Sequence, residues 1–264
     1  MKLQMTAIIK KDLQKMVSTK RMFISLLAVP LVLTVLMPTM FLLLPYFAPE
    51  QHTEFEKLLE LLPITEQSTD FHENMAGLIL NYALPVFFLI IPIMASTIMA
   101  ASSFVGEKEK QTLETLLYSP LSLAQIFQAK TAASFLLSML VSCISFSFML
   151  IVLETEIYLT AGIFILPGIQ WLLVMLLLAP ALSLIAVTLI VRISAKSQSV
   201  EDAQQGAVFL LLPILLLLVS QFSGVFLINA WMLLGLGAVC AVFAGFLLKR
   251  AMRRFTYESL NALF

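Results

Sequence analysis

Five long runs without a charged residue limit what this chain can fold into. No Asp, Glu, Lys or Arg occurs in residues 22–49, 74–106, 131–153, 157–191 or 203–248. A helix needs about 20 predominantly apolar residues to cross the hydrocarbon core of a bilayer. Each of the first four runs can hold one span, and the last can hold two spans joined by a tight turn. Because 60% of the residues are hydrophobic and only 12% are charged, we predict an all-α polytopic membrane protein with six transmembrane helices.

We expect residues 1–264 to form a single transmembrane domain. An acidic external loop is expected over residues 48–76, and a cytoplasmic segment over residues 104–130. Residues 3–19 favour an amphipathic helix in the headgroup layer, or alternatively a basic tail that only fixes the orientation. Residues 221–230 are polar enough for a re-entrant turn as an alternative to a simple loop. The expected spans cover about 22–47, 77–103, 131–153, 169–191, 206–226 and 231–248.

The distribution of basic residues predicts the orientation in the membrane. Of the 16 Lys and Arg residues, all except Lys57 lie in segments that share one side under the six-span arrangement. Such segments face the cytoplasm, so both termini are expected inside a cell membrane that the chain crosses several times. The external loop is rich in Asp and Glu, which could attract a cationic substrate, although a solvated loop is the simpler interpretation.

The sequence lacks the motifs of catalysis. No GxxxxGK[ST], GxSxG, HExxH or CxxC occurs, so the chain is expected neither to hydrolyse ATP nor to act as an enzyme. No ionisable residue lies inside an expected span, and such residues mark proton relays and ion pathways. The pattern favours a helix bundle that moves an amphiphilic substrate with energy from elsewhere. We expect no catalytic, cofactor-binding or metal-binding residue on this chain, and we interpret Cys143 and Cys240 as packing residues.

The segment 104–130 is too polar to span a bilayer and too regular to be a slack loop. Leu113, Leu116 and Leu117 share one face of a short amphipathic helix, which Pro120 ends. Ser122 is followed three residues later by Gln, which is the spacing of a capping box that starts a second helix. The apolar face needs a partner, and lipid headgroups or the chain's own helices are as probable as another protein.

Two stripes of small residues occur at four-residue spacing in the expected spans. Ser134, Ser138 and Ser142 in the third span favour close helix packing, with a polar path as the alternative. Gly237, Ala241 and Gly245 in the sixth span favour a close contact, either within the chain or between two protomers.

Residues 107–130, EKEKQTLETLLYSPLSLAQIFQAK, resemble the cytoplasmic signature of ABC-2 type permeases. Two positions depart from that pattern. Gln111 stands where the family usually has Gly, which removes a flexible point and favours a more continuous helix, and Ala129 stands where Gly often precedes the final Lys. The layout of spans is similar to that of bacterial export and sodium-efflux-like permeases. The matching residues are Glu107, Lys108, Glu109, Lys110, Thr112, Leu113, Glu114, Leu116, Leu117, Pro120 and Lys130.

The resemblance implies a half-size permease in the membrane lipid that pairs with a second permease copy or paralogue and with separate ABC ATPase subunits. ATP and Mg²⁺ would bind to those subunits, and no nucleic acid is involved. In that family the segment between spans 2 and 3 is a coupling helix seated on the ATPase. The three leucines would then be apolar anchors, and Glu107, Lys108, Glu109 and Glu114 would be rim contacts. The implied ATPase-coupling residues are Glu107, Lys108, Glu109, Thr112, Leu113, Glu114, Leu116, Leu117 and Pro120.

Two functions follow from this interpretation. The first is a permease subunit of an ATP-driven exporter, whose substrate could be an amphiphile, a peptide, a drug-like molecule or an ion. The alternative is a non-transporting membrane sensor or assembly subunit that signals through the helix in residues 104–130.

Overall fold

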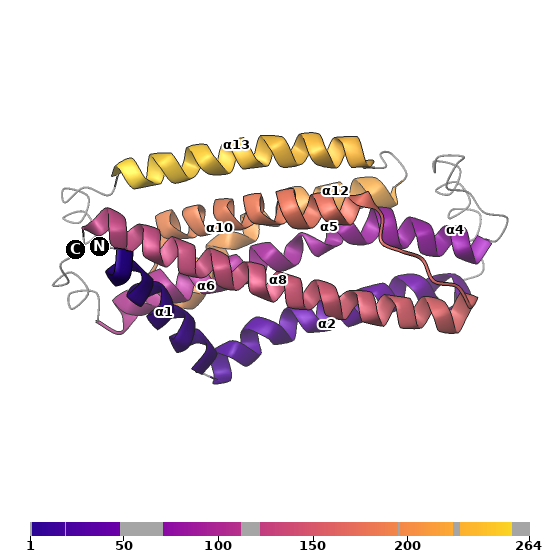
Figure 1. Ribbon diagram of the computed structural model, residues 1–264, viewed down its shortest axis with the longest axis horizontal. Coiled ribbons are helices and arrows are strands. Elements are labelled where there is room, and N and C mark those ends of the chain that lie inside the picture. The colour runs from indigo at the N-terminus through magenta and orange to yellow at the C-terminus, as the bar shows by residue number, and fades with distance from the viewer. Residues whose placement is uncertain are drawn as a thin grey trace.

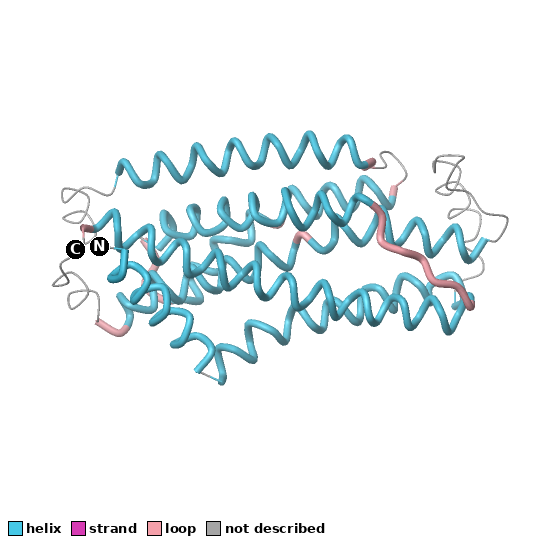
Figure 2. Tube along the Cα trace, viewed as in Figure 1, coloured by secondary structure: helices cyan, strands magenta, loops and turns pink. Residues whose placement is uncertain are grey.

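Helices that run side by side along one long axis make up the described part of the chain (Figure 1). The computed structural model describes residues 2–18, 20–47, 71–111, 122–194, 196–223 and 228–254. These ranges contain no strand (Figure 2). In chain order the elements are α1 (Lys2–Ser18), α2 (Lys20–Phe47), α4 (Phe71–Leu78), η3 (Ile79–Ala83), α5 (Leu84–Phe88), α6 (Ile90–Glu109), α8 (Leu123–Ala161), α9 (Ile169–Leu173), η4 (Val174–Leu178), α10 (Ala179–Ser194), α11 (Val200–Gly206), η5 (Ala207–Leu210), α12 (Leu212–Phe222) and α13 (Ala230–Arg254).

Long apolar helices confirm the predicted all-α membrane fold. Five helical stretches are long and apolar enough to cross a membrane, and a shorter apolar stretch covers Leu26–Met40 within α2. Together they correspond to the six spans that the five charge-free runs predicted. The side of the membrane that each end faces stays a prediction. The five long stretches are Glu73–Glu109, Ala124–Thr160, Ile169–Ser194, Val200–Gln221 and Ala230–Met252.

The column formed by α4, η3, α5 and α6 lies at the centre of the bundle. It packs against α8 on one side and α10 on another, and most of its side chains are buried. Phe88 is fully buried and meets the rings of Phe146 and Trp171 edge-on, with centroids 5.9 and 5.6 Å away. Aromatic rings in this geometry add attraction beyond the area they bury. This column is therefore the element against which the other helices are positioned.

Two π-helical turns interrupt the helices, and each comes just before a proline. η3 ends two residues before Pro85, and η4 ends two residues before Pro180. In the widened turns the backbone N–H of Leu84 bonds to the carbonyl of Ile79, and that of Ala179 bonds to Val174. The next donor in each register would be the proline, which has no N–H. The prolines thus act through a local widening of the helix, whereas the sequence alone indicates only a kink.

The helix α8, which contains the third expected span, begins at the predicted cap. Ser122 Oγ accepts from the backbone N–H of Gln125 at 3.3 Å, and the Gln125 side chain accepts from the Ser122 N–H at 3.0 Å. This confirms the capping box that the spacing predicted. The helix then runs well past the expected outer boundary at residue 153 and ends at Ala161, where Gly162 caps it with a φ of 69°. Ser134, Ser138 and Ser142 are all buried along it.

The first and the last described helices both reach the same end of the bundle. α1 and the C-terminal end of α13 are found there, together with the end of α6 and the start of α8 (Figure 1).

The flanks of the bundle are apolar and exposed, as Ile151, Leu216 and Val242 illustrate with 65 to 75% of their surface accessible. Of the two cysteines, Cys240 is partly buried but Cys143 is exposed, so the packing role expected for Cys143 is wrong.

Candidate functional site

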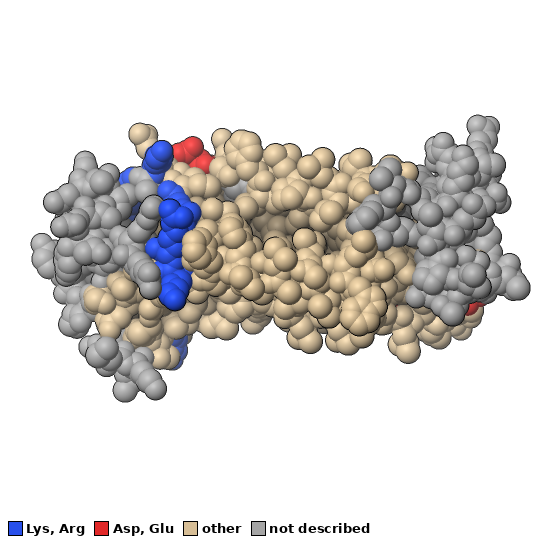
Figure 3. Space-filling view, turned by 90° about the horizontal axis from the view of Figure 1, so that it is seen from above, with Lys and Arg blue, Asp and Glu red and all other residues tan. Residues whose placement is uncertain are grey.

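The two described flanks of the segment 104–130, which is expected in the cytoplasm, lie at the α1 end of the bundle (Figure 1). α6 ends at Glu109, a turn follows through Gln111, and α8 begins after Ser122. Figure 3 shows Lys and Arg side chains gathered near this end of the face that it draws. Six of the predicted coupling residues lie outside the described residues, and their role stays a prediction: Thr112, Leu113, Glu114, Leu116, Leu117 and Pro120.

A cluster of buried charges joins three helices at this end. Lys130 of α8, Asp12 of α1 and Glu107 of α6 have only 3%, 6% and 2% of their surface exposed. Lys130 Nζ lies 3.6 Å from Asp12 Oδ2 and 3.9 Å from Glu107 Oε1. The half-exposed Lys11 lies 3.6 Å from the same Glu107 oxygen. Two carboxylates therefore face two ammonium groups, which is how buried charges become tolerable in a protein interior.

Hydrogen bonds from α6 complete this cluster, which we call the inner charge cluster. Ser103 Oγ donates to Asp12 Oδ2 at 2.9 Å. Lys130 Nζ donates to the Ser103 carbonyl at 2.6 Å and lies 3.4 Å from its hydroxyl. The Lys130 ammonium also stands 5.7 Å from the centre of the Phe104 ring, a distance at which a cation is attracted to the ring face.

The inner charge cluster holds the start and the end of the segment 104–130 together. Glu107 lies at the end of α6, where the segment begins, and Lys130 lies in α8, where the segment returns to the bundle. Both bind to the same region of α1. A force on the intervening residues would consequently act on α1, α6 and α8 as one unit, since separating them leaves a buried charge unpaired.

The predicted rim contacts divide between the interior and the surface. Glu107 was expected at the rim of a partner interface; its carboxylate is buried inside the chain, and its part in coupling stays a prediction. Lys108 is partly buried and donates to the Ser197 carbonyl at 3.3 Å. Glu109 is exposed and remains available to a partner.

Gln111 breaks the helix that the sequence was expected to continue. Its φ is 54°, in the left-handed region, and its N–H bonds to the Lys108 carbonyl at 3.0 Å. Glycine adopts this conformation freely, whereas a residue with a Cβ is strained there. The expectation of a more continuous helix is therefore wrong: the chain turns at the position where the family usually has Gly, although Gln stands there.

Sequence reasoning missed two members of the inner charge cluster, Asp12 and Ser103. Asp12 carried a usable signal, because it is the only acidic residue before Glu50 and lies in an otherwise basic segment. A lone acid of this kind needs a cationic partner if the helix packs. Ser103 carried no such signal, because small polar residues are common in membrane helices.

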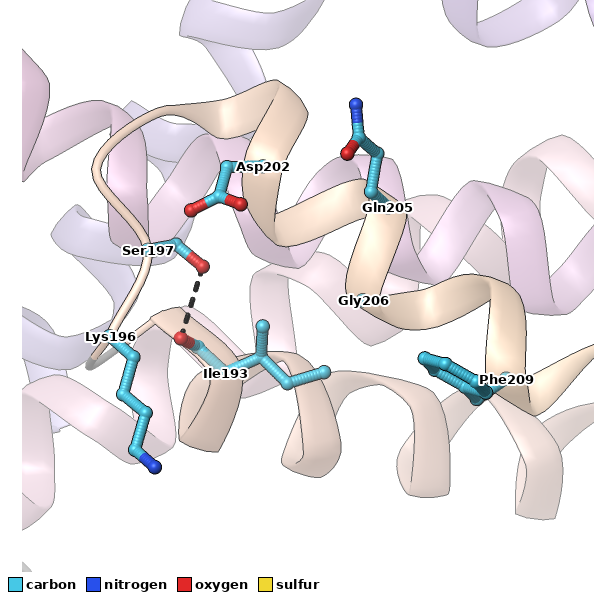
Figure 4. A pocket seen from close by; sticks show the side chains of 7 residues that line it. All are labelled: Ile193, Lys196, Ser197, Asp202, Gln205, Gly206 and Phe209. Carbon is cyan, nitrogen blue, oxygen red and sulfur yellow. Dashed lines mark hydrogen bonds between the residues drawn. The ribbon is translucent and has the colours of Figure 1, made fainter.

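A second feature of this end is an open groove between α10 and the α11–η5 segment (Figure 4). Its volume is about 500 Å³. Ser197 Oγ donates to the Ile193 carbonyl across it at 3.1 Å. The lining residues are Ile193, Lys196, Ser197, Asp202, Gln205, Gly206 and Phe209.

The three residues of the predicted protomer-packing stripe on α13 do not share one environment. A Cβ on Gly237 would lie 2.5 Å from Leu177 of η4, so this glycine packs within the chain. Ala241 is half-buried, and Gly245 is exposed with nothing within 4 Å of such a Cβ. Residues four apart on an α-helix are offset by about 40°, which rotates the stripe away from η4. Contact with another protomer stays a prediction for Ala241 and Gly245.

The inner charge cluster is suited to holding helices together. Among the described residues, no group of three or more His, Cys, Asp or Glu side chains could hold a metal ion. The inner charge cluster contains carboxylates, ammonium groups and one hydroxyl, each engaged with the others. Such a set stabilises a helix contact and offers no open position for a substrate.

Comparison with known proteins agrees with this arrangement. The model of the family described as ABC-2 type transporter matches residues 3–227, from α1 to just beyond α12. Neither the curated proteins nor the solved structures contain a significant match to the chain. The matched region covers most of the chain and includes the segment between α6 and α8. The chain therefore belongs to the ABC-2 type transporter family and is a membrane permease component of an ABC transporter.

Proposed function

We propose that this chain is the membrane subunit of an ATP-driven exporter, in which two permease chains form the path and separate ATPase subunits supply the energy. ATP and Mg²⁺ bind to the ATPase subunits. The segment between α6 and α8 docks on an ATPase through the leucine face of residues 113–117. The single observation that carries the proposal is the inner charge cluster, which connects both flanks of that segment to α1.

Charge supports a cytoplasmic position for this end. Among the described residues, exposed basic side chains occur here on α1, on the turn after α6, on α10 and on α13. Cytoplasmic flanks of membrane helices carry such an excess of Lys and Arg. A cytoplasmic ATPase would thus meet the segment on the correct side, in the cell membrane of a bacterium.

The step from ATP to transport follows from the packing. When the ATPase subunits close, the docked segment moves, and the inner charge cluster makes α1, α6 and α8 move with it. Because α6 belongs to the central column, its displacement changes the packing of α8 and α10. An amphiphilic substrate fits the predominantly uncharged spans, and the outward direction of transport is part of the proposal.

The test is recovery of the ATPase with the tagged chain from native membranes in mild detergent. We expect a P-loop ATPase in stoichiometric amount, which is lost when Leu113 and Leu117 are both replaced by Asp. Gln14→Asp is a suitable control, because Gln14 is an exposed residue of α1 and lies outside the docking face. Retention of the ATPase by the double variant would refute docking through the leucines. A wild-type chain recovered with a kinase or regulator instead would favour the sensor alternative.

A further inference from the structure

The outer half of the central column contains a backbone carbonyl that the helix cannot satisfy. In η3 the N–H of Leu84 bonds to the carbonyl of Ile79. The same register would bring Pro85 to the carbonyl of Leu80, but proline has no N–H. Leu80 is fully buried, and an unpaired buried carbonyl is costly, particularly where no water is available.

A tryptophan from α9 supplies the missing donor. Trp171 Nε1 donates to the Leu80 carbonyl at 2.9 Å. Its ring has only 2% of its surface exposed and lies against Phe88 and Phe146, with centroids 5.6 and 5.0 Å away. The Gly168 N–H just before α9 also donates to the Asn81 side chain at 2.7 Å. α9 is thus anchored to η3 by two hydrogen bonds and by aromatic packing.

α12 makes a different kind of contact with the same turn. Gln221 Nε2 donates to the Tyr82 carbonyl at 3.2 Å. Gln221 is buried, with 4% of its surface exposed, and its amide oxygen finds no hydrogen-bond partner among the described residues. One half of the buried amide is satisfied and the other half is not, so this contact stabilises the closed position less than a fully paired amide would.

The rest of α12 packs against the bundle along one narrow face. Leu212, Leu216 and Val219 are 48%, 69% and 66% exposed, while Ile214 and Leu218 are buried. A helix that contacts the bundle along one narrow face can separate from it at a lower cost than a central helix. Its outer end is attached by the 3.2 Å hydrogen bond from Gln221 Nε2 to the Tyr82 carbonyl. The amide oxygen of the same side chain has no partner among the described residues.

We propose that the Gln221–Tyr82 hydrogen bond is a latch, which closes α12 against η3 at rest and opens when the transporter changes state. The Trp171–Leu80 bond is the fixed part, because it is shorter and its ring is packed on two sides. Opening of the latch releases the outer end of α12 from the central column while α9 stays in place. The opening step rests on the proposed function, whereas the hydrogen bond itself does not.

The experiment measures how fast a buried cysteine on α12 reacts with a small water-soluble thiol reagent. The background carries Cys143→Ala and Cys240→Ala. Leu218→Cys is the reporter, because Leu218 is buried and lies one helical turn before Gln221. Val141→Cys is the control, because Val141 is fully buried in a separate cluster of α8 with α2 and α6.

The first measurement uses the chain without nucleotide. Gln221→Leu removes the donor and keeps a similar shape, and an average interhelical hydrogen bond in a membrane shifts an equilibrium about threefold. The reporter is therefore expected to react about threefold faster in Gln221→Leu than with Gln221 present, and Val141→Cys is expected to react equally in both. Ser220→Ala, one residue away and half-exposed, is the matched variant and is expected to change neither rate. Equal reporter rates with and without the Gln221 amide would overturn the latch.

The second measurement uses the complex with its co-purified ATPase, trapped with ATP and vanadate. The reporter is expected to react faster in the trapped state than without nucleotide, and Val141→Cys is expected not to respond. A purely structural hydrogen bond would leave the reporter rate independent of nucleotide, and that result with an active ATPase would overturn the opening step. Failure to recover any ATPase would instead refute the proposed function, and the opening step would fall with it, while the first measurement still decides the hydrogen bond.

Discussion

Replacement of Lys130 by Met tests the inner charge cluster most directly. The variant keeps the length of the side chain but removes the ammonium group that lies 3.6 Å from Asp12 and 3.9 Å from Glu107. Both carboxylates are almost fully buried, and only the half-exposed Lys11 remains near Glu107. Removal of one partner from a buried ion pair typically costs about 3–5 kcal/mol of folding free energy, because it leaves an uncompensated charge. We expect a loss of that size here.

The assay is reversible unfolding in mixed detergent micelles. The variant Lys130→Met/Asp12→Asn/Glu107→Gln is the matched control, since it removes the positive charge and both negative charges together. It is expected to recover most of the stability that Lys130→Met loses, because no buried charge is then left unpaired and the remaining Lys11 is half-exposed to solvent. The reasoning would be refuted if the triple variant were no more stable than Lys130→Met. It would also be refuted if Lys130→Met lowered the free energy of unfolding no more than Lys108→Met does. The ammonium of Lys108 makes a longer hydrogen bond, to a backbone carbonyl.

Two further predictions concern backbone and packing. Gln111→Gly should raise the free energy of unfolding by about 1 kcal/mol, because glycine adopts a φ of 54° without the strain of a Cβ; the same unfolding assay checks this, and Gln111→Ala should show no such gain. Gly237→Ala should lower the stability by about 1–3 kcal/mol, since its Cβ would lie 2.5 Å from a Leu177 methyl group. Gly245→Ala meets open space and should be neutral or stabilising by up to about 1 kcal/mol; equal effects at the two glycines would contradict the packing described for α13.

The features that could be predicted from the sequence depend only on residues that lie close together in one segment. The charge-free runs locate the apolar helices, because crossing a membrane depends on the composition of each helix separately. The capping box of Ser122 and Gln125 was predictable for the same reason, since its two side chains and backbone groups lie within four residues.

The features that could not be predicted depend on residues that are distant in the sequence. Glu107 reads as a surface residue of a charged motif until Lys11 of α1 and Lys130 of α8 meet it from two other helices. Ser103 and Asp12, which bond to each other, are 91 positions apart. The prolines predicted a disturbance of the helix but not its form, because the widened turn of η3 depends on a donor that Trp171 supplies from α9.

The inner charge cluster and the proposed Gln221–Tyr82 latch both involve the central column of α4, η3, α5 and α6. A movement at one of them can therefore reach the other through that column. Glu107 lies near one end of the column and Tyr82 lies 25 residues earlier, a separation of about 40 Å along a helix that rises 1.5 Å per residue. The intervening residues Leu84–Val105 are mostly buried against α8 and α10, and a packed interior deforms little. A displacement at Glu107 therefore reaches η3 as a movement of the whole column rather than as a bend within α6. The hydrogen bond that such a movement breaks first is the weakest one at the outer end, which is that of Gln221, because Trp171 is held by its ring as well as by its donor.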